Sequence, residues 1–70
     1  MQVKPNAYKL IKKERLNIGM TGSELARRIG LTPQHFWRIE NNKNKFTLEL
    51  AFKIAKALNV SIKKFTQKLN

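Results

Sequence analysis

Apolar residues recur every three or four positions along most of this chain, the spacing that places side chains on one face of an α-helix. The residues predicted to face inward form five groups: Ala7, Ile11 and Ile18; Leu25, Ala26 and Ile29; Phe36 and Ile39; Leu48, Ala51, Ile54, Ala55 and Leu58; and Ile62, Phe65 and Leu69. No stretch of useful length alternates between apolar and polar residues, as a half-buried strand does. The pattern therefore predicts an all-α domain of five short helices.

Residues that favour helix ends separate these five groups. We expect Gly19 and Gly30 to end the first two helices. The third helix is predicted to begin at Thr32-Pro33, because threonine is a preferred cap and a missing N–H costs nothing at the first helical position. Thr47 and Ser61 are predicted to cap the fourth and fifth helices.

The charge of the chain adds a first indication of function. Fifteen Lys and Arg residues face four Asp and Glu, which gives a formal net charge of +11. Neutralising phosphates is the commonest use of such an excess in a small domain. Seventy residues predict a single domain over residues 1–70. The absence of cysteine and of a membrane-length apolar run fits a cytoplasmic protein that has no contact with a membrane.

Residues 21–39, TGSELARRIGLTPQHFWRI, have the form of a helix-turn-helix. Two short helices are joined by a three-residue turn that begins at Gly30, and the second helix starts with polar residues. Packing between the two helices holds the second one rigidly, with its polar residues pointing outward. The major groove of B-DNA is wide enough to admit such a helix.

A longer set of residues carries a family resemblance. The matching features are Arg15 before Leu16-x-x-Gly19, then Glu24-Leu25-Ala26, Gly30-Leu31-Thr32, Ile39-Glu40-Asn41, Thr47-Leu48-Glu49, Ile54-Ala55-Lys56-Ala57-Leu58 and Val60-Ser61. In this order and spacing, residues 10–65 resemble the Cro/cI-like (XRE) helix-turn-helix family, which includes the lambda-type phage repressors. The resemblance implies a compact five-helix lambda-repressor-like domain that inserts its third helix into the major groove, and a dimer on a palindromic operator.

The resemblance also implies a set of DNA-binding residues. The third-helix positions expected to face the DNA are Thr32, Gln34, His35 and Arg38. The loop positions expected to meet the phosphate backbone are Asn41, Lys43, Asn44 and Lys45. Glutamine can pair with adenine N6/N7, and arginine four residues further on can fork onto guanine O6/N7. Trp37 is expected to touch a sugar-phosphate or a thymine methyl group, and an exposed tryptophan equally marks protein contacts.

One matching pair is structural rather than DNA-binding. The resemblance implies that Arg15 and Glu40 form an ion pair that ties helix 3 to helix 1. The chain departs from the family at Gly22, where a DNA-contacting glutamine is common, and at Pro33, where a polar residue is usual. Phe46 stands where a proline is frequent. The first two departures remove side-chain contacts to DNA.

Nothing in the sequence points to an enzyme. His35 is the single histidine, and it stands without cysteine or a carboxylate cluster, so no metal site is expected. No glycine-rich phosphate loop or nucleophile–base pair is present, and neither a cofactor nor a small-molecule effector is expected.

The leading interpretation is a transcriptional regulator, a repressor of the Cro or controller kind, that binds double-stranded operator DNA as a homodimer through helices 4 and 5. The residues proposed for the dimer are Phe52, Phe65 and Leu69, although the last two can instead close the core of a monomer. One alternative is a protein-interaction module, such as an antitoxin or adaptor, with Trp37 and Phe52 as anchors. Another is a non-specific nucleic-acid binder that acts through charge alone.

Overall fold

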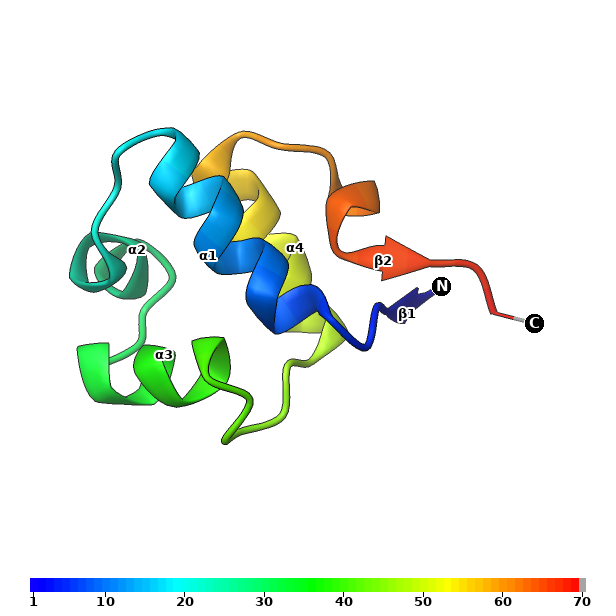
Figure 1. Ribbon diagram of the computed structural model, residues 1–70, viewed down its shortest axis with the longest axis horizontal. Helices are drawn as coiled ribbons and strands as arrows, with labels where there is room; N and C mark the ends of the chain where they lie inside the picture. The colour runs from blue at the N-terminus through cyan, green and yellow to red at the C-terminus, as the bar shows by residue number, and fades with distance from the viewer. Residues whose placement is uncertain (70) are drawn as a thin grey trace.

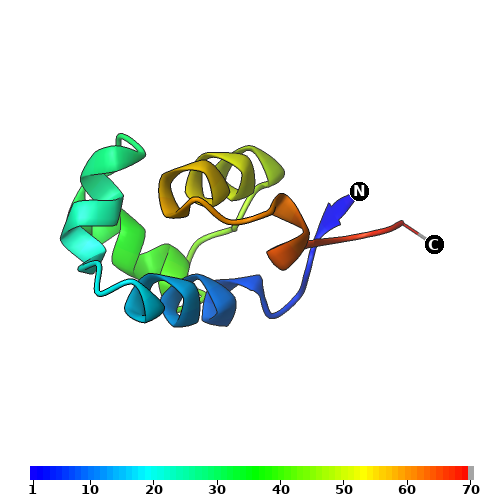
Figure 2. The ribbon, with the colours of Figure 1, turned by 90° about the horizontal axis from the view of Figure 1, so that it is seen from above.

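The computed structural model describes residues 1–69. In chain order the elements are β1 (Gln2–Val3), α1 (Ala7–Asn17), α2 (Gly22–Arg28), α3 (Pro33–Glu40), α4 (Leu48–Leu58), a 3₁₀ turn (Ile62–Lys64) and β2 (Thr66–Gln67). Figure 1 shows α1 passing in front of α4, with α2 and α3 toward one end and the two strands at the other. Viewed from above, α1 and α4 form two layers, and both chain termini lie at the strand end (Figure 2).

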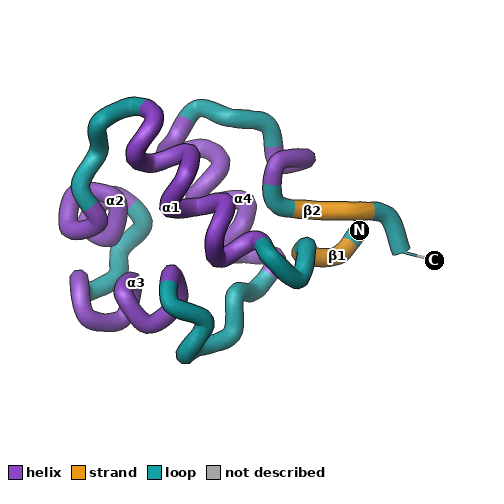
Figure 3. The backbone as a smooth tube through the Cα atoms, viewed as in Figure 1, coloured by secondary structure: helices purple, strands orange, loops and turns teal. Residues whose placement is uncertain are grey.

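The fifth predicted helix is wrong. Ser61 does act as a cap, since its hydroxyl accepts a bond from the N–H of Lys63, but the segment makes a single 3₁₀ turn. The chain then becomes β2, which pairs antiparallel with β1, Val3 opposite Thr66 (Figure 3). Because Thr66 Oγ1 donates 2.9 Å to the carbonyl of Ile62, that carbonyl is satisfied without a longer helix. The described residues therefore form a mostly helical domain of four α-helices with a small sheet, and the predicted count of five helices is wrong.

The strand pairing explains which of the predicted fifth-helix residues reach the core. Phe65 is fully buried, whereas Leu69 lies beyond β2 and is 64% exposed. The carbonyl of Phe65 accepts a 2.9 Å bond from the N–H of Lys4, which fastens the N-terminal segment beside the end of the chain. The sequence pattern predicted no strand in this part of the chain. A two-residue strand is too short to show an alternating pattern, so this pairing left no periodic signal.

Most residues of the core are ones that the periodicity predicts. The large side chains that are completely buried are Phe36, Phe65, Ile11, Leu25, Ile39 and Ile54. Two predicted inward positions of helices 1 and 4 are wrong, because Ile18 is 54% exposed and Leu48 is 36% exposed. Ile18 follows the last residue of α1, and Gly19, with φ of +68°, turns the chain so that Met20 enters the core instead.

The predicted caps of α3 and α4 are confirmed. Thr32 and Thr47 have extended backbones, and each side chain accepts the N–H of the third residue beyond it, at 3.1 and 3.2 Å. Thr21 caps α2 in the same way, with a 3.1 Å bond from Glu24. Each cap satisfies one of the N–H groups that a helix leaves unpaired. None of the helices in residues 1–69 has the length and apolar character of a membrane span.

Candidate nucleic-acid interface

The turn between α2 and α3 fixes the position of α3. Gly30 has φ of +79°, a conformation that costs glycine nothing, and the N–H of Leu31 returns to the carbonyl of Ala26 at 2.9 Å. Ala26 is completely buried, so no side-chain bulk separates the two helices. The two helices contact each other more extensively than any other pair of elements. As a result α3 is held on one face and open on the other.

The open face of α3 carries most of the residues that the sequence predicted for DNA contact. Gln34, His35, Trp37 and Arg38 are exposed, while Phe36 is buried beneath them. Residues four apart on a helix differ by about 40° in direction, so Gln34 and Arg38 share one line of this face. A parallel line holds Pro33 and Trp37, and the four residues of the two lines border one shallow depression: Pro33, Gln34, Trp37 and Arg38.

Arg38 is oriented by the loop that follows α3. Its Nε donates to Asn44 Oδ1 at 3.1 Å. The backbone N–H groups of Lys43 and Asn44 both return to the carbonyl of Arg38, at 2.7 and 3.3 Å, after a turn in which Asn42 has φ of +58°. Among the described residues the two terminal nitrogens of Arg38 make no hydrogen bond, so they can still fork onto a base or a phosphate.

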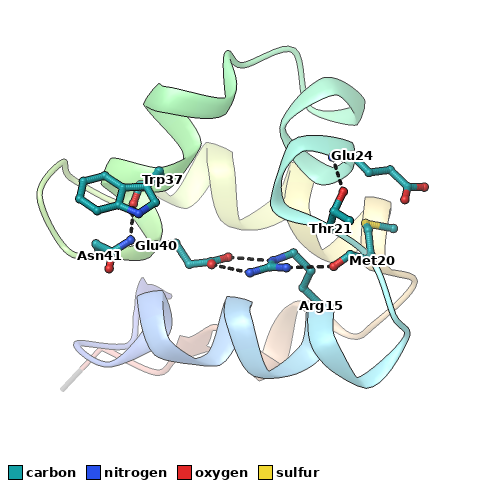
Figure 4. Close-up of polar contacts among 7 residues, drawn as sticks. All are labelled: Arg15, Met20, Thr21, Glu24, Trp37, Glu40 and Asn41. Carbon is teal, nitrogen blue, oxygen red and sulfur yellow. Dashed lines mark hydrogen bonds and ion pairs between the residues drawn. The ribbon is translucent and has the colours of Figure 1, made fainter.

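The loop residues Asn41, Lys43, Asn44 and Lys45 divide into two kinds. Asn41 and Asn44 use their side chains within the protein. Asn41 Nδ2 donates to the carbonyl of Trp37 at 2.8 Å (Figure 4), and Asn44 Oδ1 accepts the bond from Arg38. Lys43 and Lys45 are exposed and make no ion pair within residues 1–69. Thr32 is exposed too, and its oxygen already accepts the capping bond from His35. The structure thus brings Arg38 together with Asn44 and Trp37 with Asn41.

A buried ion pair supports α3 from behind. Arg15 Nη2 lies 2.7 Å from Glu40 Oε1, and Arg15 Nε donates to Glu40 Oε2 at 3.1 Å. Arg15 Nη1 also donates 2.9 Å to the carbonyl of Met20. Figure 4 shows this guanidinium joining α1, the end of α3 and the loop before α2. Only 10% and 8% of the two side chains are exposed, so Glu40 contributes no free charge to the outer face.

The positions at which the chain departs from the family pattern have distinct surroundings. A Cβ added to Gly22 would lie 3.6 Å from Phe36 Cε2, an ordinary contact distance, so the site has room for a side chain. Phe46 is half-buried, and its ring centroid lies 6.2 Å from that of Phe65. Pro33 occupies the first position of α3. The loss of a contact at Gly22 is therefore not imposed by packing.

Two contacts that position the candidate interface could not be predicted from the sequence. The bond between Arg38 and Asn44 depends on the left-handed turn at Asn42, and the bond from Arg15 to the Met20 carbonyl depends on where α1 ends. The sequence held a partial signal for the first, since asparagine tolerates positive φ better than most residues. No three acidic or histidine side chains in residues 1–69 lie together as a metal site requires.

Two short helices at a glycine turn, with the second one open on its polar face, define a helix-turn-helix domain. The sequence profile of the Helix-turn-helix family matches residues 11–65. The chain belongs to this family, in its XRE-type branch.

Known proteins similar to this chain include regulators and an antitoxin. Antitoxin HipB of Escherichia coli (strain K12) is 39% identical over 57 residues, which are 81% of this chain and 61% of HipB, so the chain spans about three fifths of that relative. The restriction-modification controller protein C.Esp1396I is 36% identical, with a TM-score of 0.74 over 80% of this chain and 72% of the controller. The biofilm master regulator SinR, solved in complex with DNA, is 28% identical, with a TM-score of 0.71 over 81% and 95%.

Proposed function

We propose that this domain is a transcriptional repressor that binds operator DNA sequence-specifically, with α3 in the major groove. The observation that carries the proposal is the open face of α3, where Gln34 and Arg38 share one line and Asn44 holds Arg38 in place. Glutamine and arginine are the side chains best suited to adenine and guanine edges. The likeness to SinR, which was solved with DNA, supports this docking.

The loop after α3 supplies the second half of the proposed interface. Lys43 and Lys45 are exposed in the loop that follows α3, and Glu40, the acid nearest to Lys43 along the chain, is occupied by Arg15. Exposed lysines of this kind contact phosphates, and phosphate contacts set the register of a protein on the duplex, while base contacts give specificity. His35, which is exposed near the start of α3, is assigned to the same surface.

The test begins with selection of bound sequences from a random DNA pool, followed by affinity measurements on the selected site and on a scrambled one. Arg38→Ala should weaken binding to the selected site by about 1–3 kcal/mol and relax the preference at one base position. Lys63→Ala is the matched control, because it removes the same charge from the 3₁₀ turn, near the strand end of the molecule (Figure 1). Equal loss on both DNA sites would make Arg38 a phosphate contact and refute its role in base recognition.

We also propose that two copies bind a palindromic operator through α4. Phe52 and Leu48 lie four residues apart on α4 and are 49% and 36% exposed, so they form an apolar strip. Phe65 is fully buried and is available only to the monomer core, which removes it from the dimer surface predicted from the sequence. Sedimentation with a palindromic duplex should show two chains per duplex at saturation, and Phe52→Ala should reduce this to one. One wild-type chain per duplex would contradict the dimer.

A second candidate function is a protein-interaction module such as an antitoxin. The likeness to HipB favours it, together with the exposure of Trp37 and Phe52. This candidate predicts that selection from a random pool enriches no sequence. The non-specific alternative predicts the same absence of enrichment but strong, salt-dependent binding to any duplex. The selection experiment and a salt series therefore separate the three functions.

A further inference from the structure

The most unusual feature of the open face of α3 is its tryptophan. Trp37 is 55% exposed, and Figure 4 shows its indole on the outer side of α3, pointing away from α2. Its backbone carbonyl is bonded to Asn41, which fixes the end of the helix around it. Pro33, one turn earlier, borders the same depression, so an apolar ring pair lies beside the polar line of Gln34 and Arg38.

The chemistry of the major groove restricts what such a ring pair can meet. The base edges there offer hydrogen-bond donors and acceptors, and their one apolar group is the C5-methyl of thymine. Docking α3 as proposed above would bury the indole, because it lies within the same depression as Gln34 and Arg38. Burial of an apolar surface against another apolar group is favourable in free energy, because both surfaces are removed from water.

We propose that Trp37, backed by Pro33, reads the C5-methyl group of a thymine at one position in each half of the binding site. This inference rests on the proposed function, since it requires α3 to lie in the major groove. The charge near the depression favours DNA over an apolar protein partner, because the exposed Arg38 borders it and the backbone N–H of the exposed Lys43 is bonded to the carbonyl of Arg38. A polyanion complements that surface, whereas an apolar partner would have to desolvate it.

Replacing single thymines by deoxyuridine tests the proposal, because this change removes the methyl group and leaves the base pairing intact. The probe is the duplex that the wild-type protein selects from a random pool. At one thymine per half-site, deoxyuridine should weaken wild-type binding about three- to fivefold, the factor that corresponds to about 0.8 kcal/mol for one buried methyl group. In Trp37→Ala the loss at that thymine should disappear, while the response to the other positions persists.

Ile18→Ala is the control for the loss of an exposed apolar side chain. Ile18 is 54% exposed, close to the value for Trp37, and it lies in the turn after α1. Its deoxyuridine response should equal that of the wild type. Thermal melting of Trp37→Ala should remain close to that of the wild type, since truncating an exposed side chain changes stability by little. If Trp37→Ala then no longer distinguishes the deoxyuridine duplex from the parent duplex, unfolding of the variant is not the cause.

Each remaining outcome overturns the proposal in a distinguishable way. If selection enriches no sequence, the proposed function fails and this inference fails with it. If a site is enriched but every deoxyuridine duplex binds as tightly as the parent, or no thymine occurs in the half-site, the function stands and methyl recognition is wrong. If Trp37→Ala keeps both the affinity and the deoxyuridine response, Trp37 lies outside the DNA contact and is left as an anchor for a protein.

Discussion

The ion pair between Arg15 and Glu40 gives the clearest prediction about stability. Removing the Glu40 side chain leaves a guanidinium that keeps one partner, the Met20 carbonyl, and loses two charge-assisted bonds of 2.7 and 3.1 Å. The Arg15 side chain is only 10% exposed, so water cannot fully replace the carboxylate. Stranding a buried charge in this way costs about 3–5 kcal/mol.

That cost is large for a domain of this size. At about 0.05–0.15 kcal/mol per residue, 70 residues have a total free energy of unfolding of roughly 4–10 kcal/mol. A loss of 1 kcal/mol lowers the melting temperature of such a domain by about 4–8 °C, so Glu40→Ala should lower it by roughly 12–40 °C. At the upper end of this range the variant is unfolded at 25 °C.

Thermal and urea unfolding, followed by circular dichroism, measure this effect. Glu24→Ala is the matched control, because Glu24 and Arg28 form an ion pair of similar length, 2.8 Å, on the surface. The side chains of Glu24 and Arg28 are 35% and 51% exposed. Exposed pairs contribute about 0–1 kcal/mol, so this variant should melt within a few degrees of the wild type. Replacing Arg15 and Glu40 together by Met and Leu should restore part of the loss. If Glu40→Ala melts at the wild-type temperature, the pair does not stabilise the fold.

Three further predictions concern the loop, the second helix and the end of the chain. Lys43→Ala should weaken binding to selected and scrambled DNA alike and make the dependence of log K on log salt shallower by about one unit, measured by a salt titration. Gly22→Ala should raise the free energy of unfolding by about 0.4–1 kcal/mol, because the added methyl group restricts the unfolded chain and meets Phe36 at an ordinary distance of 3.6 Å. A lower midpoint of urea unfolding would show that the site has no room for the methyl group. Phe65→Ala should lower the free energy of unfolding by about 3–5 kcal/mol, and Leu69→Ala should lower it by under about 0.5 kcal/mol. Equal effects in urea unfolding would contradict a structure in which Phe65 is buried and Leu69 is exposed.

The four α-helices could be predicted from the sequence because each one combines a periodic apolar stripe with a local end signal. The start of α3 is the best example, since Thr32 and Pro33 specify it through the cap and the first helical position. The end of α4 is encoded locally as well, because Asn59 adopts φ of +57°, which asparagine tolerates. Elements of this kind depend on neighbours within about four residues, which a single sequence displays.

The last segment could not be predicted for a physical reason. Ile62, Phe65 and Leu69 repeat at helical spacing, but the segment pairs with Gln2–Val3, more than 60 positions away in the chain. Pairing between distant segments leaves no local signature when the strands are only two residues long. The buried Phe65 is compatible with a helix or a turn, so its apolar character alone did not decide between them.

For the candidate interface, the sequence could supply a list of expected positions, but it could not supply their geometry. The sequence placed Arg38 and Asn44 in the same set, but it did not show that one holds the other. An arginine already fixed at Nε loses less side-chain freedom when it binds, so in the proposed complex this contact would lower the entropic cost of binding DNA. Because Gly22 adds no side chain from α2, the proposed reading of bases falls on the residues of α3. Under that proposal, the orientation that Asn44 gives to Arg38 should matter more here than in a relative with a glutamine at the start of the second helix.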